Sequence, residues 1–118
     1  MKTLIIGAST NPERYAYLAA NRLVQHRHEI VLLGQKTGKV LGHKIETEKT
    51  QFTDIDTVTL YVSPKNQPAY QDYIIGLKPR RVIFNPGAEN PELENILTKN
   101  GIEAIEACTL VMLSIGNY

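Results

Sequence analysis

The residues best suited to chemistry in this chain follow its first apolar run, residues 3–6. A loop of small and polar residues comes next, and the pattern of a helix begins directly after it. A buried strand that turns into a helix in this way leaves unpaired backbone N–H groups at the helix start, where the helix dipole adds partial positive charge. The loop also carries hydroxyl groups and a guanidinium. It is therefore predicted to bind phosphate through Gly7, Ala8, Ser9, Thr10, Asn11 and Arg14.

Three further polar loops follow later strands and are candidates for the same site. Residues 34–42 are punctuated by glycine and contain Lys36 and Lys39, whose flexible charges suit phosphate groups. The turns at 62–64 and 85–87 contain proline, which fixes the direction of the backbone. Ligands of parallel α/β sheets bind beyond the carboxyl ends of the strands, so these loops are expected to meet the first one there. They supply the candidate residues Lys36, Val62, Ser63, Pro64, Asn85, Pro86 and Gly87.

The loop sequences narrow the choice of nucleotide. Gly7 is the only glycine of the first loop, so the G-x-G-x-x-G fingerprint of NAD sites is absent, and no P-loop motif exists in the chain. The second strand is followed by Gly34, Gln35 and Lys36, with a cation where an NAD site would have an acid. A cation at this position suits a phosphorylated ribose. On these grounds, the 3′-phosphate of coenzyme A and the 2′-phosphate of NADP are both candidates for the group that Lys36 would bind.

Strands and helices that alternate along the chain must position these loops. Strands are expected at residues 3–7, 29–33, 57–62, 81–84 and 102–105, with a weakly marked edge strand near residues 44–45. Helices are expected from Glu13 to about Arg27, from residue 66 or 67 to 77, from Pro91 with Asn90 as its N-cap and Gly101 as its terminator, and from 109 to 115. This alternation predicts a three-layer Rossmann-like α/β fold with a mostly parallel sheet in the order 3-2-1-4-5. Residues 34–42 are expected to be a loop.

Size and charge limit the classes of function. The chain has 118 residues, which predicts one domain over residues 1–118, and its formal net charge is +1. So balanced a charge gives no overall field for nucleic acid or an anionic membrane, and neither is expected as a partner. No apolar run reaches the length of a membrane span, no signal peptide is recognised, and Cys108 is the one cysteine. A cytoplasmic location is therefore expected.

An ordered set of short motifs runs along the chain. A Gly-x-Ser-x-x-Pro-x-Arg-x-x-Tyr pattern is met by Gly7, Ser9, Pro12, Arg14 and Tyr17. Residues 40–42 (Val-Leu-Gly), the proline-bounded segment 62–68, the Asn-Pro-Gly turn at 85–87 and the late Cys108 follow in order. With this set the chain resembles the small stand-alone CoA-binding proteins. Their domain is similar to the CoA-binding domain of succinyl-CoA synthetase α-subunits and ADP-forming acyl-CoA synthetases.

The resemblance implies coenzyme A or an acyl-CoA as the ligand. By the resemblance, the diphosphate is expected on residues 7–11, the ribose phosphate near Lys36, and adenine or pantetheine against residues 62–64. The chain departs from the family at Gly34 and Gln35, where Asn-Pro is common, and at residues 112–114, where the family has a histidine.

No nucleophile with a base and an orienting group is visible in the sequence. The favoured interpretation is therefore CoA binding through the phosphate loop without evident catalysis. An enzyme that uses NADP or another nucleotide, and an interaction module whose nucleotide site has decayed, are the alternatives. A homo-oligomer or an acyl-CoA enzyme is a compatible partner. For Cys108 the sequence leaves open a place in the apolar core and a mixed disulfide with the CoA thiol.

Overall fold

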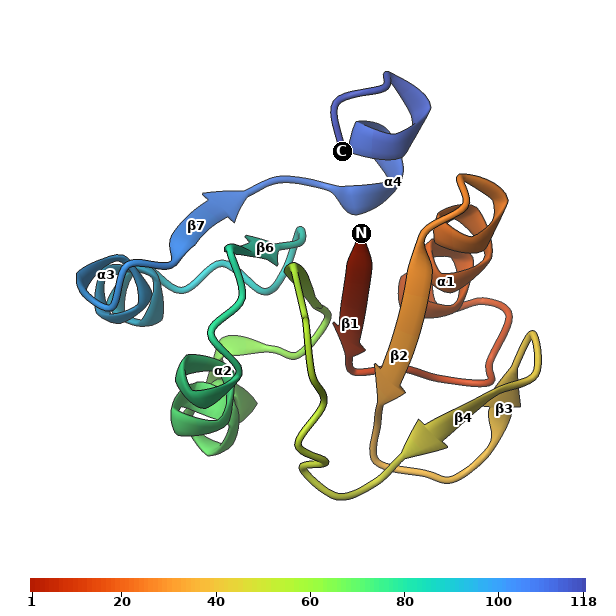
Figure 1. The fold of residues 1–118 in the computed structure, drawn as a ribbon, viewed down its shortest axis with the longest axis horizontal. Coiled ribbons are helices and arrows are strands. Elements are labelled where there is room, and N and C mark those ends of the chain that lie inside the picture. The colour runs from red at the N-terminus through yellow and green to blue at the C-terminus, as the bar shows by residue number, and fades with distance from the viewer.

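Seven strands form one sheet in the computed structural model, which describes residues 1–118 (Figure 1). Their order across the sheet is β3-β4-β2-β1-β5-β6-β7, and every pairing is parallel except that of β3 with β4. The strands are β1 (Lys2–Ile6), β2 (Glu29–Leu33), β3 (Lys39–Val40), β4 (His43–Glu46), β5 (Thr57–Leu60), β6 (Arg81–Phe84) and β7 (Glu103–Glu106). The predicted class, a Rossmann-like fold with a mostly parallel sheet, is confirmed.

Four α-helices and one 3₁₀-helix connect the strands. They are α1 (Tyr15–Gln25), the 3₁₀-helix η1 (Pro64–Tyr70), α2 (Gln71–Leu77), α3 (Pro91–Lys99) and α4 (Thr109–Ser114). The predicted start of α3 is confirmed, because the side chain of Asn90 accepts a hydrogen bond from the Leu93 N–H. No helix combines the length and the apolar character that a membrane crossing requires.

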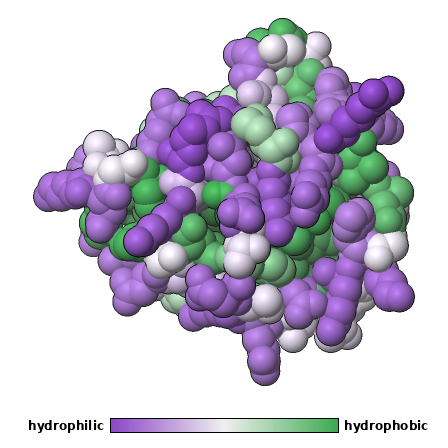
Figure 2. All heavy atoms as spheres, in the orientation of Figure 1, coloured by the Kyte–Doolittle hydropathy of each residue, from purple (hydrophilic) through white to green (hydrophobic).

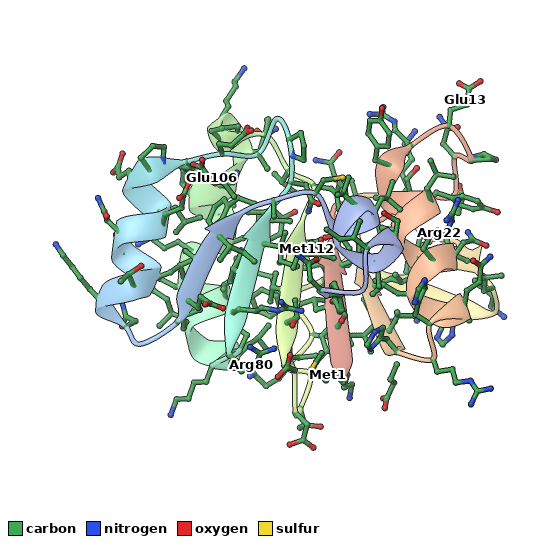
Figure 3. All side chains as sticks on the ribbon, turned by 90° about the horizontal axis from the view of Figure 1, so that it is seen from above. Met1, Glu13, Arg22, Arg80, Glu106 and Met112 are labelled. Carbon is green, nitrogen blue, oxygen red and sulfur yellow. The ribbon has the colours of Figure 1, made fainter.

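Apolar side chains pack against both faces of the sheet. Leu4 and Ile6 of β1 belong to one buried cluster, together with residues of α2 and α3. Ile5 belongs to a second cluster, with residues of α1 and with Leu113 of α4. Neighbouring side chains of a strand point to opposite faces, so β1 is buried on both sides, which explains its continuous apolar run. Helices α2 and α3 therefore cover one face, and α1 and α4 cover the other (Figures 1 and 3).

The sheet differs from the expected strand order at its two edges. The expected order 3-2-1-4-5 counted the strands without β3, so it corresponds to β4-β2-β1-β5-β6, which the structure contains. Strand β7 extends this order by one parallel strand. At the other edge, β3 lies inside the segment 34–42, which was predicted to be a loop, and it forms a hairpin with β4, the edge strand expected near residues 44–45. Leu41 and Gly42 both have positive φ angles at its tip, +51° and +80°, the conformation of a tight hairpin turn. Only one of these two residues is a glycine, so the sequence carried a weak turn signal.

The helix expected from residue 66 or 67 begins earlier and in another form. Its first part is the 3₁₀-helix η1, and regular α-helix starts only at Gln71. Pro68 lies inside η1, and it has no N–H to donate to a preceding carbonyl. The chain therefore reaches α2 through a tighter turn, which brings Tyr70 back toward the end of the sheet.

Candidate functional site

A cleft of about 700 Å³ opens at the edge of the sheet where β1, β2 and β5 end. Glu13 and Glu106 mark this edge in Figure 3, and Met1 and Arg80 mark the opposite edge, where the strands begin. The structure brings most of the predicted site residues to this one cleft. They are Gly7, Ala8, Ser9, Thr10, Asn11, Arg14, Lys36, Val62, Ser63, Pro86 and Gly87.

The first loop is fixed to the neighbouring strand by its own backbone. The N–H groups of Gly7 and Ala8 both donate to the Leu33 carbonyl, at 2.9 Å each. The Asn11 N–H donates to the Ser9 hydroxyl at 3.0 Å. These three amides are therefore occupied, which leaves the N–H groups of Ser9 and Thr10 without an acceptor in the protein.

The start of α1 adds two more unpaired amides to the same cleft. Tyr15 and Ala16 line the cleft, and their N–H groups have no acceptor in the protein. Arg14 stands at the N-cap position, and no side chain caps the helix. Since the positive end of the helix dipole lies here, the four free amides form a site that favours an anion.

The charged side chains that line the cleft are cations. Arg14 and Lys36 are exposed, and neither lies within 4.0 Å of a carboxylate. No aspartate or glutamate lines the cleft. In a chain whose net charge is only +1, these cations give the cleft a local positive charge. Figure 2 shows one face of the molecule, on which hydrophilic residues surround smaller hydrophobic areas.

Close backbone packing shapes the floor of the cleft. A Cβ atom on Gly34 would overlap the carbonyl oxygen of Ala8. Gly7 has φ of +95°, and a Cβ there would lie 2.8 Å from the carbonyl oxygen of Tyr61. Glycine at these two positions lets the ends of β1, β2 and β5 approach one another directly below the loop at residues 7–14.

Aromatic side chains contribute to the lining of the cleft. Tyr61 and Tyr70 are half-buried and line it, and Tyr15 is exposed at the start of α1. Burial raises the pKa of Tyr61 to about 12, so its phenol stays protonated at neutral pH. The lining contains no histidine and no cysteine.

Two of the predicted site residues do not line the cleft. Asn85 is buried, its side-chain amide donates to the Thr59 hydroxyl at 2.8 Å, and its side-chain oxygen accepts from the Thr109 N–H at 2.9 Å. Pro64 begins η1 and lines a smaller neighbouring hollow of about 250 Å³. The turn residues Pro86 and Gly87 line the cleft, whereas Asn85 ties β6 to β5 and to α4.

Several lining residues were not among the predicted site residues, although two of them belong to the loop 34–42 that was expected at the site. Gln35 and Gly34 lie beside Lys36, so the position after the second strand was a usable signal for them. Asn66 and Tyr70 line the cleft because η1 turns the chain back, which the sequence did not indicate. The remaining unpredicted lining residues are Tyr15, Ala16, Tyr61 and Ala88.

The cysteine and the histidines lie elsewhere. Cys108 is half-buried at the N-cap of α4 and is not among the residues that line the cleft. No group of three or more histidine, cysteine, aspartate or glutamate side chains is arranged to hold a metal ion.

Comparisons with known proteins place this geometry in context. A family model described as a CoA binding domain matches residues 1–114. The crystal structure of an uncharacterized protein has a TM-score of 0.98 and 56% sequence identity, covering 99% of this chain and 97% of that one. A hypothetical protein from Pyrococcus horikoshii OT3 has a TM-score of 0.87 and 25% sequence identity, covering 96% of this chain and 81% of that one. A protein from Thermus thermophilus has a TM-score of 0.87 and 16% sequence identity, covering 99% of this chain and 90% of that one. At this low identity, the likeness shows the fold alone. A search of curated proteins found no match.

Proposed function

The chain belongs to the family of CoA-binding domains, and from this membership we propose that it binds coenzyme A or an acyl-CoA in the cleft. The observation that carries the proposal is one cleft lined by four unpaired amides and two unpaired cations. Backbone amides at a helix start, together with arginine and lysine, are the donors that proteins use for diphosphate groups. The diphosphate of CoA is therefore assigned to Ser9, Thr10 and the start of α1.

The rest of the cleft suits the other parts of a CoA molecule. Its volume of about 700 Å³ falls within the usual range for small-molecule sites, about 300–1,000 Å³. Lys36 supports a ribose phosphate beyond β2. Adenine or pantetheine would lie along Val62 and Ser63, beside the rings of Tyr61 and Tyr70.

The proposed activity is binding rather than a reaction. General acid–base and nucleophilic catalysis use histidine, cysteine and carboxylate side chains, and also serine, threonine, tyrosine or lysine activated by a neighbouring base. The cleft lining contains hydroxyl groups and Lys36, but no histidine, cysteine or carboxylate that could activate them. The residues of this cleft therefore favour a protein that holds a CoA thioester unchanged.

Calorimetric titration with CoA, acetyl-CoA and NADPH tests the proposal. We expect saturable heat with CoA or acetyl-CoA and weaker or no binding of NADPH. Binding of NADPH in preference to CoA would favour the enzyme alternative and contradict the proposal. Absence of heat with all three ligands up to millimolar concentration would leave the interaction module as the better interpretation.

Substitution of the two unpaired cations provides the residue-level test. Arg14→Ala and Lys36→Ala should each weaken CoA binding by about 1.5–3 kcal/mol, because each removes a charge-assisted hydrogen bond. Arg22→Ala is the matched control, since Arg22 is an exposed cation in the last turn of α1, away from the cleft. Equal affinities in all three variants and the native protein would rule out a contact of Arg14 with the diphosphate and of Lys36 with the ribose phosphate.

A further inference from the structure

A second lysine stands at the end of the strand next to β2. Strands β2 and β4 are paired in parallel, with Leu33 opposite Glu46 as the last pair. Lys36 lies three residues beyond Leu33, and Lys49 lies three residues beyond Glu46. Because the two strands end together, both lysines follow the carboxyl edge of the sheet, where the cleft opens.

The ammonium group of Lys49 lies beside one aromatic residue of the cleft wall, Tyr70. Its Nζ lies 5.7 Å from the centroid of the Tyr70 ring, and Tyr70 lines the cleft. The next residue, Thr50, is also held, because the Tyr73 hydroxyl donates to its carbonyl at 2.6 Å. The segment after β4 is therefore attached to η1 and α2. Lys49 itself does not line the cleft, but its ammonium group lies near Tyr70, which does.

The charge of Lys49 is available to a ligand. The carboxylate of Glu46 already accepts from the Thr50 hydroxyl and lies 3.6 Å from the ammonium of Lys44. Glu48 is exposed, and no carboxylate lies within 4.0 Å of Lys36 or Lys49. Lys36 beyond β2 and Lys49 beyond β4 are thus cations without a carboxylate partner, while Glu46 at the end of β4 already contacts Thr50 and Lys44.

We propose that Lys49 acts with Lys36 to bind a phosphomonoester on the ribose of the ligand. This inference rests on the proposed nucleotide site, and it identifies the ribose phosphate as the part of the ligand that the two lysines recognise. In Rossmann-like sheets the ribose lies beyond the end of the second strand, and a cation there accepts a ribose phosphate. A phosphomonoester carries a charge of about −1.5 to −2 at neutral pH, which a pair of cations neutralises better than one. The 3′-phosphate of CoA and the 2′-phosphate of NADP share this chemistry.

The experiment compares ligands that differ only in this phosphate. Affinities for CoA and 3′-dephospho-CoA are measured by calorimetry for the native protein, Lys49→Gln and Lys44→Gln. The native protein should prefer CoA by about tenfold or more. Lys49→Gln should reduce this preference roughly threefold to tenfold while binding dephospho-CoA as well as the native protein does. Lys44→Gln removes an exposed lysine of β4 that is paired with Glu46, and it should leave the preference unchanged.

The outcomes separate the inference from the proposed function. An unchanged preference in Lys49→Gln, or an equal loss of affinity for both ligands, would overturn the role of Lys49 while CoA binding stands. If neither CoA nor dephospho-CoA binds the native protein, the proposed function fails. In that case the affinities for NADPH and NADH, which differ only by the 2′-phosphate, are compared in the native protein and in Lys49→Gln. If the native protein prefers NADPH and Lys49→Gln reduces that preference, the two lysines bind the 2′-phosphate of NADP. If the native protein shows no such preference, the inference is rejected.

Discussion

At the residue scale, one backbone junction determines the shape of the cleft. The carbonyl oxygen of Ala8 lies where a Cβ of residue 34 would be, and the N–H groups of Gly7 and Ala8 share the Leu33 carbonyl. The Gly34 N–H in turn donates to the Glu46 carbonyl at 2.9 Å. The loop at residues 7–14, β2 and β4 are thus joined through backbone atoms. A side chain added at Gly34 would force this junction apart.

We predict that Gly34→Ala lowers both stability and ligand affinity. The added methyl group cannot be accommodated by a side-chain rotation, because the obstructing atom belongs to the backbone. The free energy of unfolding, measured by urea denaturation, should fall by about 1–3 kcal/mol. The proposed CoA binding should weaken because the loop at residues 7–14 is displaced.

The matched control for this substitution is Gly76→Ala. Gly76 lies in α2 with nothing within 4 Å of an added Cβ, so alanine there should be neutral or stabilise the protein by up to about 1 kcal/mol. If both variants unfold at the same urea concentration as the native protein, the close contact at Gly34 does not limit the fold.

At the scale of elements, Asn85 connects two strands and a helix. Its side-chain amide donates to Thr59 of β5 and to the Leu60 carbonyl, at 2.8 and 3.0 Å. Its side-chain oxygen accepts the first N–H of α4, from Thr109. The hydroxyls of Thr59 and Thr109 also share a hydrogen bond of 2.7 Å. This buried polar network determines where α4 begins, because α4 has no side-chain cap of its own at Cys108.

We predict that Asn85→Ala destabilises the protein by about 2–4 kcal/mol, since each buried polar group left unpaired costs about 1–3 kcal/mol. The loss should also loosen α4, measured as faster amide hydrogen exchange in residues 109–114. Asn95→Ala is the control, because Asn95 is exposed on α3, and it should change stability by less than about 0.5 kcal/mol. Equal protection of α4 in both variants would argue against this role of Asn85.

At the scale of the whole molecule, Tyr118 joins the C-terminal segment to the beginning of the sheet. Helix α4 crosses the sheet beside α1 (Figure 3), and the Tyr118 hydroxyl forms a hydrogen bond with that of Thr3. The Tyr118 ring centroid lies 4.6 Å from the guanidinium carbon of Arg81 and 4.9 Å from the ring centroid of His28. Arg81 is 5% exposed, it has no carboxylate within 4.0 Å, and its Nη2 has no hydrogen-bond partner. The ring of Tyr118 therefore covers a buried cation that lacks a counter-ion.

We predict that Tyr118→Ala lowers the free energy of unfolding by about 2–4 kcal/mol. It removes most of a half-buried aromatic side chain and uncovers Arg81. Tyr15→Ala serves as the control in chemical denaturation, because Tyr15 is 70% exposed and should contribute little to stability. A similar small effect in both variants would show that the C-terminal segment adds little to the stability of the sheet.

The sequence predicted the local features that depend on a few neighbouring residues. The apolar runs of the central strands, the capped start of α3 at Asn90 and the polar loop at residues 7–14 are all visible in short windows. It could not show that Asn85 points inward, because an asparagine before proline and glycine is an ordinary turn residue. It also could not show that Pro68 within η1 returns Tyr70 to the cleft.

By itself, the amino-acid sequence determined the α/β class, the inner strand order and the loops at the carboxyl edge, because hydrophobic periodicity and turn residues act locally. Only the tertiary structure decided which amides remain unpaired, which turn residue is buried, and that Lys49 lies beside Tyr70. These features depend on contacts between segments far apart in the chain. Packing and hydrogen bonding between such segments depend on which strands and loops become neighbours in the folded chain, and a short window of sequence does not show that.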